Sequence, residues 1–341
     1  MKTIIITVCI LVAVLFMLYI AVGEAFYHLA IDAHSDKWFL RPKKSKRKTA
    51  EDAVDPDSNG YDSVSENPAE AEARDLDTAY FETHIPEIRE TVSVIRGKST
   101  TLKGYYFQAA APSDKWLLWF HGYASELRWS RRWIRILGER GYHVLAPDMR
   151  GHGMSGGDYI GMGWDDRLDA LAWIDSIVKE HPAARILVSG VSMGGATVIS
   201  LSGEPLPPQV KCLIADCGYT AVSDILSYQL HNLFRLPDIP FLYAAAGAIR
   251  RHAGYDIFRA SGVEQVKKAV LPMLFIHGEA DKFVPFPMLK TVFDAAGSES
   301  GVTVDKQMLA VPDAGHGVSC CAHPDLYWET YLAFADQYME I

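Results

Sequence analysis

Short apolar runs alternate with segments of helical spacing in this chain, and this alternation constrains its fold more than any other feature. Most of the runs are apolar at consecutive positions, as expected for strands buried on both faces of a sheet. The predicted strands are 91–96, 105–109, 116–120, 143–146, 185–191, 210–215, 272–276 and 306–311, and the predicted helices are 129–140, 165–180, 194–202 and 324–338. The pattern predicts an α/β fold, with a mostly parallel central sheet covered by helices on both faces.

One long insertion interrupts this alternation. Residues from about 217 to 269 separate two strands that a single crossover helix could connect. The insertion contains apolar helical segments with prolines, as a cap over a binding cleft would. Extra packing helices in an ordinary crossover are the alternative. We expect a helical cap that governs which substrates reach the cleft.

The amino-terminal segment contains nineteen uncharged residues, from Ile4 to Val22, which is enough to cross a bilayer as a helix. A cleaved signal peptide is the alternative, but residues 21–23 fit its cleavage motif poorly. We therefore predict a single-pass membrane anchor over residues 1–23. The acidic residues that follow favour an extracytoplasmic catalytic domain, whereas the basic run 41–48 favours the opposite orientation.

A polar segment follows the anchor. Residues 41–78 are rich in charged and small side chains and nearly lack large apolar ones, which predicts a flexible tether within residues 24–84. Its basic run, 41–48, is interpreted either as a contact for anionic lipid or as a solvated charge run. The remaining residues, 85–341, form the predicted catalytic domain with its cap.

Composition excludes some classes of function. The 341 residues carry a formal net charge of −9, which argues against a nucleic-acid-binding protein. The five cysteines are odd in number and lack metal-type spacing, so we expect mostly free thiols. The sequence has no recognisable cofactor or metal motif, and we predict neither. It does not indicate an oligomeric state.

A serine between a predicted strand and a predicted helix is the strongest chemical signal. Ser192 lies in GVSMG, which matches G-x-S-x-G, after the strand RILVSGV and before the helix GGATVISLS. This context is typical of a nucleophile elbow, a tight turn whose glycines relieve the clashes that side chains would create. The same five residues without that context would carry little weight.

A serine nucleophile needs a base and an acid that orients the base. Asp281 and His316 both follow predicted parallel strands, so they should lie at the same edge of the sheet as Ser192. Their order along the chain, Ser, Asp, His, is the order expected of this architecture. Asp216, which ends another strand, is the rival acid. We predict Ser192, Asp281 and His316 as the catalytic residues.

The oxyanion of the reaction needs two hydrogen-bond donors. We predict the backbone N–H of Met193, at the start of the helix after the nucleophile, and that of Tyr123, in the loop after WLLWFHG. His121 is interpreted as a structural hydrogen-bonding residue. The glycine-rich segment 147–159, which contains Ser155, lacks a strand-helix elbow and is interpreted as a rigid loop near the site.

These motifs together resemble those of the α/β-hydrolase superfamily, from Glu87 to the last residue. The resemblance rests on five motifs, HGY (121–123), PDMRGHG (147–153), GVSMGG (190–195), HGEAD (277–281) and AGHG (314–317). Two further segments, 157–169 and 216–220, look like those of bacterial membrane-anchored hydrolases of the YqkD-like group, related to the Bem46 and serine-aminopeptidase-like branches. The resemblance implies Ser192 as nucleophile, Asp281 as acid, His316 as base, and an amino-terminal anchor with the domain outside.

The predicted reaction is acyl transfer to water through an acyl-enzyme. A carboxylic ester is the favoured substrate, because an alkoxide leaves without the protonation that an amine requires. The predicted partners are a small ester or amide and, through the amino-terminal helix, a membrane. The alternatives are an aminopeptidase-like amide hydrolase, an enzyme acting on a bilayer lipid, and a non-catalytic membrane-tethered binding module.

Overall fold

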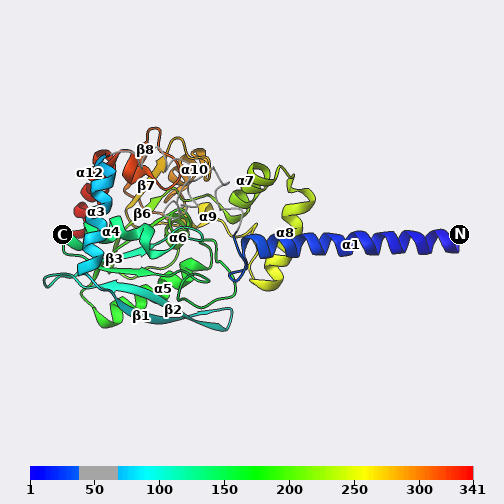
Figure 1. The fold of residues 1–341 in the computed structure, drawn as a ribbon, viewed down its shortest axis with the longest axis horizontal. Coiled ribbons are helices and arrows are strands. Elements are labelled where there is room, and N and C mark those ends of the chain that lie inside the picture. Colours follow the sequence, from blue (N-terminus) through cyan, green and yellow to red (C-terminus); the bar gives the residue numbers. More distant parts are fainter. Residues whose placement is uncertain (38–67, 341) are drawn as a thin grey trace, which may run out of the picture.

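The centre of the molecule is an eight-stranded sheet with the order β1-β2-β4-β3-β5-β6-β7-β8 (Figure 1). The computed structural model describes residues 1–37 and 68–340. The first three strands of this order pair antiparallel, and those from β4 to β8 are parallel. The strands are β1 (Glu87–Ile95), β2 (Lys98–Phe107), β3 (Lys115–Phe120), β4 (His143–Pro147), β5 (Arg185–Val191), β6 (Val210–Asp216), β7 (Met273–Gly278) and β8 (Lys306–Val311). The predicted fold class, a mostly parallel sheet, is confirmed.

The parallel strands are buried because helices cover both faces of the sheet. Neighbouring residues on β3 illustrate this: Leu118 belongs to one apolar core and Leu117 to the other. Such alternation is the period-two geometry of a strand, and it explains why the sequence reads as a continuous apolar run. The first core contains Trp173 and the second contains Trp133, from helices on opposite faces.

The helices of the catalytic domain follow the predicted alternation. α5 (Asp166–Glu180) and α6 (Met193–Leu201) contribute to the first core, and α4 (Arg131–Glu139) and α12 (Pro324–Met339) contribute to the second. α10 (Pro287–Ala295), which was not predicted, also packs in the first core. The remaining elements of this part are η3 (Leu127–Ser130), α9 (Gly262–Val266) and α11 (Ser319–Ala322).

Besides the short α9, two longer helices occupy the insertion between β6 and β7. These are α7 (Val222–Phe234) and α8 (Asp238–His252). They lie at the end of the catalytic domain from which the amino-terminal helix projects (Figure 1). Their apolar residues, such as Ile225 and Leu242, join the core that lies on this side of the sheet. The insertion is therefore helical and covers one end of the domain, as the cap interpretation expects.

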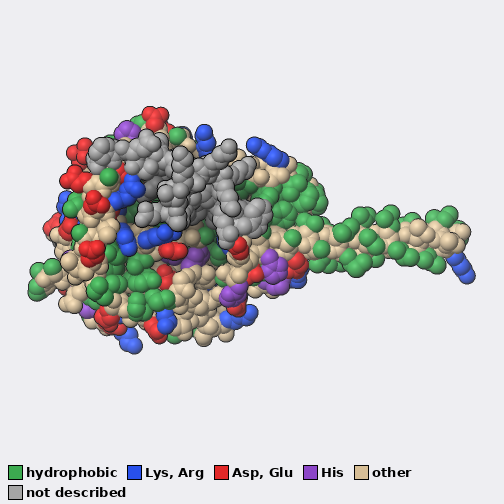
Figure 2. Space-filling view, viewed as in Figure 1, with side chains coloured by type: hydrophobic (Ala, Val, Ile, Leu, Met, Phe, Trp, Pro, Cys, Tyr) green, Lys and Arg blue, Asp and Glu red, His purple; other side chains and the backbone are tan. Residues whose placement is uncertain are grey.

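The amino-terminal helix α1 (Lys2–Ala30) extends away from the domain over most of its length (Figures 1 and 2). It is long and apolar enough to cross a bilayer, and its apolar window is fully exposed, so it is a candidate membrane anchor. The helix continues to Ala30, beyond the predicted anchor boundary at residue 23. Its last turns pack on α8, where Gly23 is buried against the backbone of Ala244.

Part of the predicted tether forms a second helix. α3 (Pro68–Thr83) packs beside α4, where Arg132 pairs with Glu70 and Asp77. All three side chains are buried, and Tyr80 adds an apolar contact to the second core. A flexible tether was predicted here because the segment has few apolar side chains. Buried ion pairs with a distant helix order it instead, and they cannot be read from its composition. The basic run 41–48 lies outside the described residues.

Candidate active site

The predicted nucleophile elbow lies at the junction between β5 and α6. Ser192 has φ 58° and ψ −116°, a conformation that is strained for a residue with a side chain. Gly190 and Gly194 make the turn possible, because a Cβ at either position would collide with backbone atoms at the end of β3. The turn directs the Ser192 hydroxyl toward His316.

The three predicted catalytic side chains form one hydrogen-bonded chain. His316 Nε2 lies 2.8 Å from Ser192 Oγ, and His316 Nδ1 lies 2.8 Å from Asp281 Oδ2. Asp281 follows β7 and His316 follows β8, and both strands run parallel to β5 in the sheet. With the carboxylate accepting from Nδ1–H, Nε2 is free to accept the Ser192 proton. This arrangement can activate an alcohol for attack on a carbonyl carbon.

Further contacts hold the Asp281 carboxylate in place. Its Oδ1 accepts hydrogen bonds from the backbone N–H groups of Phe283 and Val284 at 2.8 and 2.9 Å. His277 Nε2 lies 3.1 Å from Oδ2. Burial alone would raise the pKa of Asp281, but the charges and hydrogen bonds of His316 and His277 outweigh it and lower that pKa. The group therefore stays an anion.

The predicted base, His316, is also buried. Burial opposes its protonation, whereas the charge of the Asp281 carboxylate and its hydrogen bond to Nδ1 favour it, and the pKa of His316 lies well above its ordinary value. An imidazolium formed when Ser192 loses its proton is therefore stabilised where it forms.

The rival acid, Asp216, has a different environment. It ends β6, is fully buried, and accepts a 3.0 Å hydrogen bond from the Tyr327 hydroxyl on α12. Burial raises the pKa of Asp216 to about 6. Its carboxylate forms no hydrogen bond with His316 among the described contacts, whereas that of Asp281 does. The geometry thus pairs His316 with Asp281.

The two predicted oxyanion donors lie beside the nucleophile. Met193 is the first residue of α6, so its N–H has no carbonyl one turn earlier in the helix to bond. Gly122, which precedes Tyr123, approaches closely enough that a Cβ on it would lie 3.4 Å from Ser192 Cβ. His152 Nε2 accepts the N–H of Ala124 at 3.1 Å and supports the same loop.

His121 and Ser155 make structural contacts. His121 donates from Nδ1 to Gly122 O at 2.7 Å and accepts Met149 N–H at Nε2, and burial lowers its pKa to about 3. Ser155 Oγ bonds the backbone of Lys103 and Asp148. Neither side chain contacts the Ser192 hydroxyl among the described contacts, as their interpretation as structural residues expects.

Cys217 is a site residue that the sequence reasoning did not identify. It follows β6 with φ 41°, is buried, and places its sulfur within 4.8 Å of the ligand atoms of Asp281 and His316. Among the described residues this is the one group of three side chains that could hold a metal ion. A metal there would occupy the hydrogen-bonding atoms of the triad. Burial raises the pKa of Cys217 to about 12, so its thiol stays protonated. The only feature of the sequence that could have indicated Cys217 as a site residue is its position after Asp216 in the segment DCGYT.

Two cavities meet at Ser192. One, of about 880 Å³ and partly open to solvent, has an almost wholly apolar lining from α1, α7 and α8. The other, of about 1350 Å³, is more polar and is lined by His316, Arg128 and Arg131 among others. Ser192 and Tyr123 line both cavities. A molecule bound at Ser192 can therefore extend to either side of this residue.

Comparison with known proteins agrees with this architecture. Residues 111–234 match the family model described as serine aminopeptidase, S33. The chain is 25% identical to the uncharacterized protein YqkD of Bacillus subtilis, over 93% of each chain, and 25% identical to protein bem46 of Schizosaccharomyces pombe, over 72% of this chain and 76% of that one. Its fold is similar to that of the Pyrococcus furiosus esterase Pf2001, with a TM-score of 0.58, 22% identity, and coverage of 74% of this chain and 93% of the esterase.

The fold, the family match and these relatives together define the class of protein. The chain has the α/β-hydrolase fold, and its sequence is similar to those of YqkD and bem46 and, over residues 111–234, to the serine aminopeptidase family S33. It is a hydrolase of this class with a candidate membrane anchor at its amino terminus.

Proposed function

We propose that this protein is a serine hydrolase that cleaves carboxylic esters through an acyl-enzyme. Ser192 Oγ attacks the ester carbonyl while His316 Nε2 accepts its proton, and Asp281 stabilises the resulting imidazolium. His316 then returns the proton to the departing alkoxide, and later activates the water that releases the acid. The hydrogen-bonded chain from Ser192 through His316 to Asp281 is the observation that carries this proposal.

The oxyanion of each tetrahedral intermediate accepts hydrogen bonds from the N–H groups of Met193 and Tyr123. The positive end of the α6 dipole adds to the stabilisation at Met193. Preorganised donors of this kind are worth about 3–4 kcal/mol each in transition-state stabilisation. The close approach of Gly122 to Ser192 supports this assignment.

An ester is favoured over the amide substrate of an aminopeptidase. An aminopeptidase needs an acidic group that is free to bind the substrate's ammonium. Among the described residues that line the polar cavity, Glu70 and Asp77 are the acidic ones, and both are ion-paired with Arg132. The apolar cavity suits an acyl group instead. A non-catalytic binding module is disfavoured by the intact hydrogen-bonded triad.

The proposal also includes an organisation of the chain into three parts. Residues 1–23 form a single-pass membrane anchor, residues 85–341 form the hydrolase domain with its cap at about 217–269, and residues 24–84 connect them. The acidic residues after the anchor favour a domain on the extracytoplasmic side. Labelling of intact cells with a membrane-impermeant reagent specific for the domain tests this orientation.

Replacement of the nucleophile tests the reaction. Ser192→Ala should lower kcat for a p-nitrophenyl ester by roughly 10⁴-fold or more and abolish labelling by a fluorophosphonate probe. Ser155→Ala is the matched control, because Ser155 lies in a neighbouring loop without contact to His316. Ser155→Ala should keep the wild-type kcat and the wild-type labelling by the probe. Undiminished labelling of Ser192→Ala would overturn the proposal.

A further inference from the structure

The candidate membrane helix forms part of the wall of the apolar cavity at the active site. Phe26, Leu29 and Ala30, all in the last two turns of α1, line the cavity together with Ser192. The ring of Phe26 packs edge-on against Phe234 of α7 at 6.0 Å between centroids. It contacts Phe241 of α8 in the same way at 6.1 Å. Without α1, the cavity would lack this wall.

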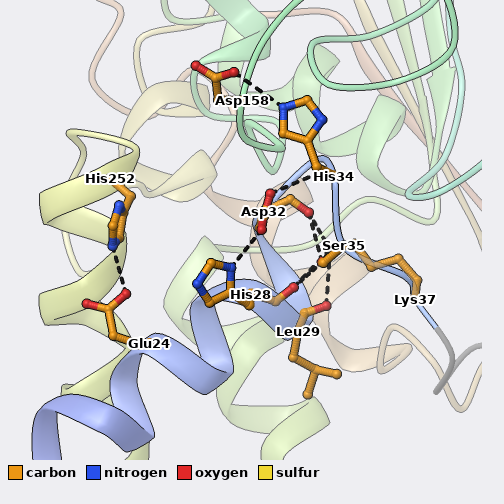
Figure 3. A network of polar contacts seen from close by, with 9 residues as sticks. All are labelled: Glu24, His28, Leu29, Asp32, His34, Ser35, Lys37, Asp158 and His252. Carbon is orange, nitrogen blue, oxygen red and sulfur yellow. Dashed lines mark hydrogen bonds and ion pairs between the residues drawn. The ribbon is translucent and has the colours of Figure 1, made fainter.

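Polar contacts fix the end of α1 to the catalytic domain (Figure 3). Glu24 pairs with His252 of α8 at 2.7 Å and with Arg251 at 2.6 Å. Beyond the helix, Ile31 O accepts the N–H of Ile160 at 2.7 Å, and Ile31 is fully buried. Contacts on both sides of the cavity-lining residues hold the wall in one position.

The two cavities differ in their relation to the base. Among the described lining residues, His316 lines the polar cavity and is absent from the apolar one. In acyl transfer the base gives its proton to the leaving group, so the leaving group must lie on the His316 side. The acyl group therefore lies in the apolar cavity, against α1, α7 and α8.

The helix α1, which forms this wall of the cavity, continues into the predicted membrane-spanning stretch. The uncharged stretch from Ile4 to Val22 is about 28 Å long as a helix, which matches a hydrocarbon core of about 30 Å. Phe26 then lies about 6 Å beyond the end of that stretch along the helix axis. Exposed apolar side chains of the cap, Leu233 and Tyr243 among them, lie at this end of the domain, where Figure 2 shows apolar surface next to α1.

We propose that the last two turns of α1 form one wall of an acyl-binding site, and that the substrate is an ester whose long acyl chain comes from the bilayer in which α1 is embedded. The helix then has two roles, anchoring the chain and limiting the acyl length that fits. Leu233 lines the cavity and is also 42% exposed, so the cavity opens beside the cap on the membrane side. This inference rests on the proposed serine hydrolase function and adds the substrate class.

Variants of Leu29 test the wall in the full-length protein, reconstituted in phosphatidylcholine vesicles. The probes are the p-nitrophenyl esters of acetate, dodecanoate and hexadecanoate. Leu29→Trp fills the cavity and should lower the ratio of kcat/KM for dodecanoate to that for acetate at least tenfold. Leu29→Ala enlarges the cavity and should shift the preference toward hexadecanoate.

Ala25→Trp is the matched control, because Ala25 lies on the exposed side of the same helix and does not line the cavity. Its chain-length ratio should equal that of the wild type. If Leu29→Trp leaves the ratio unchanged, or Ala25→Trp lowers it equally, the wall assignment is wrong. Fluorophosphonate labelling of Ser192 is measured in each variant. If the Leu29 variants are labelled but keep the wild-type chain-length ratio, this inference alone is wrong. If the wild-type protein is not labelled, the proposed function is wrong as well.

A separate measurement tests whether the ester reaches the active site from the bilayer. Monopalmitoylglycerol in the same vesicles as the protein should be hydrolysed at least ten times faster than the same ester in separate vesicles. Equal initial rates would show that the acyl chain does not arrive through the shared bilayer, and would overturn that part of the inference.

Discussion

The Tyr123 hydroxyl donates a 2.6 Å hydrogen bond to the carbonyl oxygen of Ala30, the last residue of α1. Carbonyl groups in the last turn of a helix have no partner within the helix, so this bond satisfies one of them. The backbone N–H of Tyr123 is the proposed second oxyanion donor. One residue thus connects the amino-terminal helix with the proposed site of ester cleavage.

Removing that hydroxyl should weaken catalysis without abolishing it. Tyr123→Phe keeps the ring and the backbone N–H but frees the loop from α1. We expect kcat for a short ester to fall about fivefold, which corresponds to about 1 kcal/mol for one hydrogen bond. Tyr338→Phe is the control, because it removes a hydroxyl bonded to Asp305 far from the site. Equal kcat values for the two variants would contradict a positioning role for Tyr123.

The Asp281 carboxylate should control the pH dependence of activity. It raises the pKa of His316, so its replacement in Asp281→Asn should lower that pKa. The acid limb of the profile of kcat/KM against pH should therefore move to lower pH, because His316 must be neutral to act as a base. The activity at neutral pH should fall by about 10³–10⁴-fold, since the amide no longer orients and stabilises the imidazole.

Asp216→Asn is the corresponding control for the rival acid. Its carboxylate bonds Tyr327 and not His316, so we expect less than a tenfold loss of kcat/KM and an acid limb at the wild-type pH. If this variant loses more activity than Asp281→Asn, Asp216 is the acid of the site.

The sequence predicted most strands and the residues of the candidate site, because both depend on local patterns. Ser192, Asp281 and His316 each follow an apolar run, and parallel strands bring the ends of such runs to one edge of the sheet. The position of Phe26 and Leu29 in the wall of the cavity at Ser192 leaves no such pattern in the sequence. Their partners on α7 and α8 lie some two hundred positions away, and an apolar residue near a membrane segment reads as part of the anchor.

A similar reason explains the helix α3. Its composition is that of a solvated segment, and two buried arginines of a distant helix, Arg132 and Arg135, give its acidic residues partners that the composition does not indicate. The environment of Asp166 is a third feature that the sequence does not indicate. A carboxylate at the start of a helix is ordinary in sequence, yet burial raises the pKa of Asp166 to about 7.

The protonation of Asp166 should make the stability of the protein depend on pH. Its pKa rises from 3.8 to about 7 on folding, so the folded state binds a proton more tightly than the unfolded state. The free energy of unfolding should therefore fall as the pH rises from about 4 to 7, by up to about 4 kcal/mol from this group. Asp166→Asn should lack this component, so its thermal midpoint should fall less between pH 5 and 8. Asp175→Asn, on the exposed side of the same helix, should follow the wild type.

The buried ion pairs between α3 and α4 predict where the protein is most sensitive to loss of a charge outside the site. Asp77 accepts from Arg132 at 2.6 Å and from Arg135 at 2.7 Å, and both its oxygens are used. Asp77→Ala leaves two buried guanidinium groups short of a partner, which should cost about 3–5 kcal/mol of unfolding free energy. Asp75→Ala removes an exposed carboxylate from the same helix and should change it by less than about 0.5 kcal/mol. Denaturant unfolding monitored by tryptophan fluorescence compares the two variants. Similar midpoints for both would mean that α3 is not held to the domain by these ion pairs.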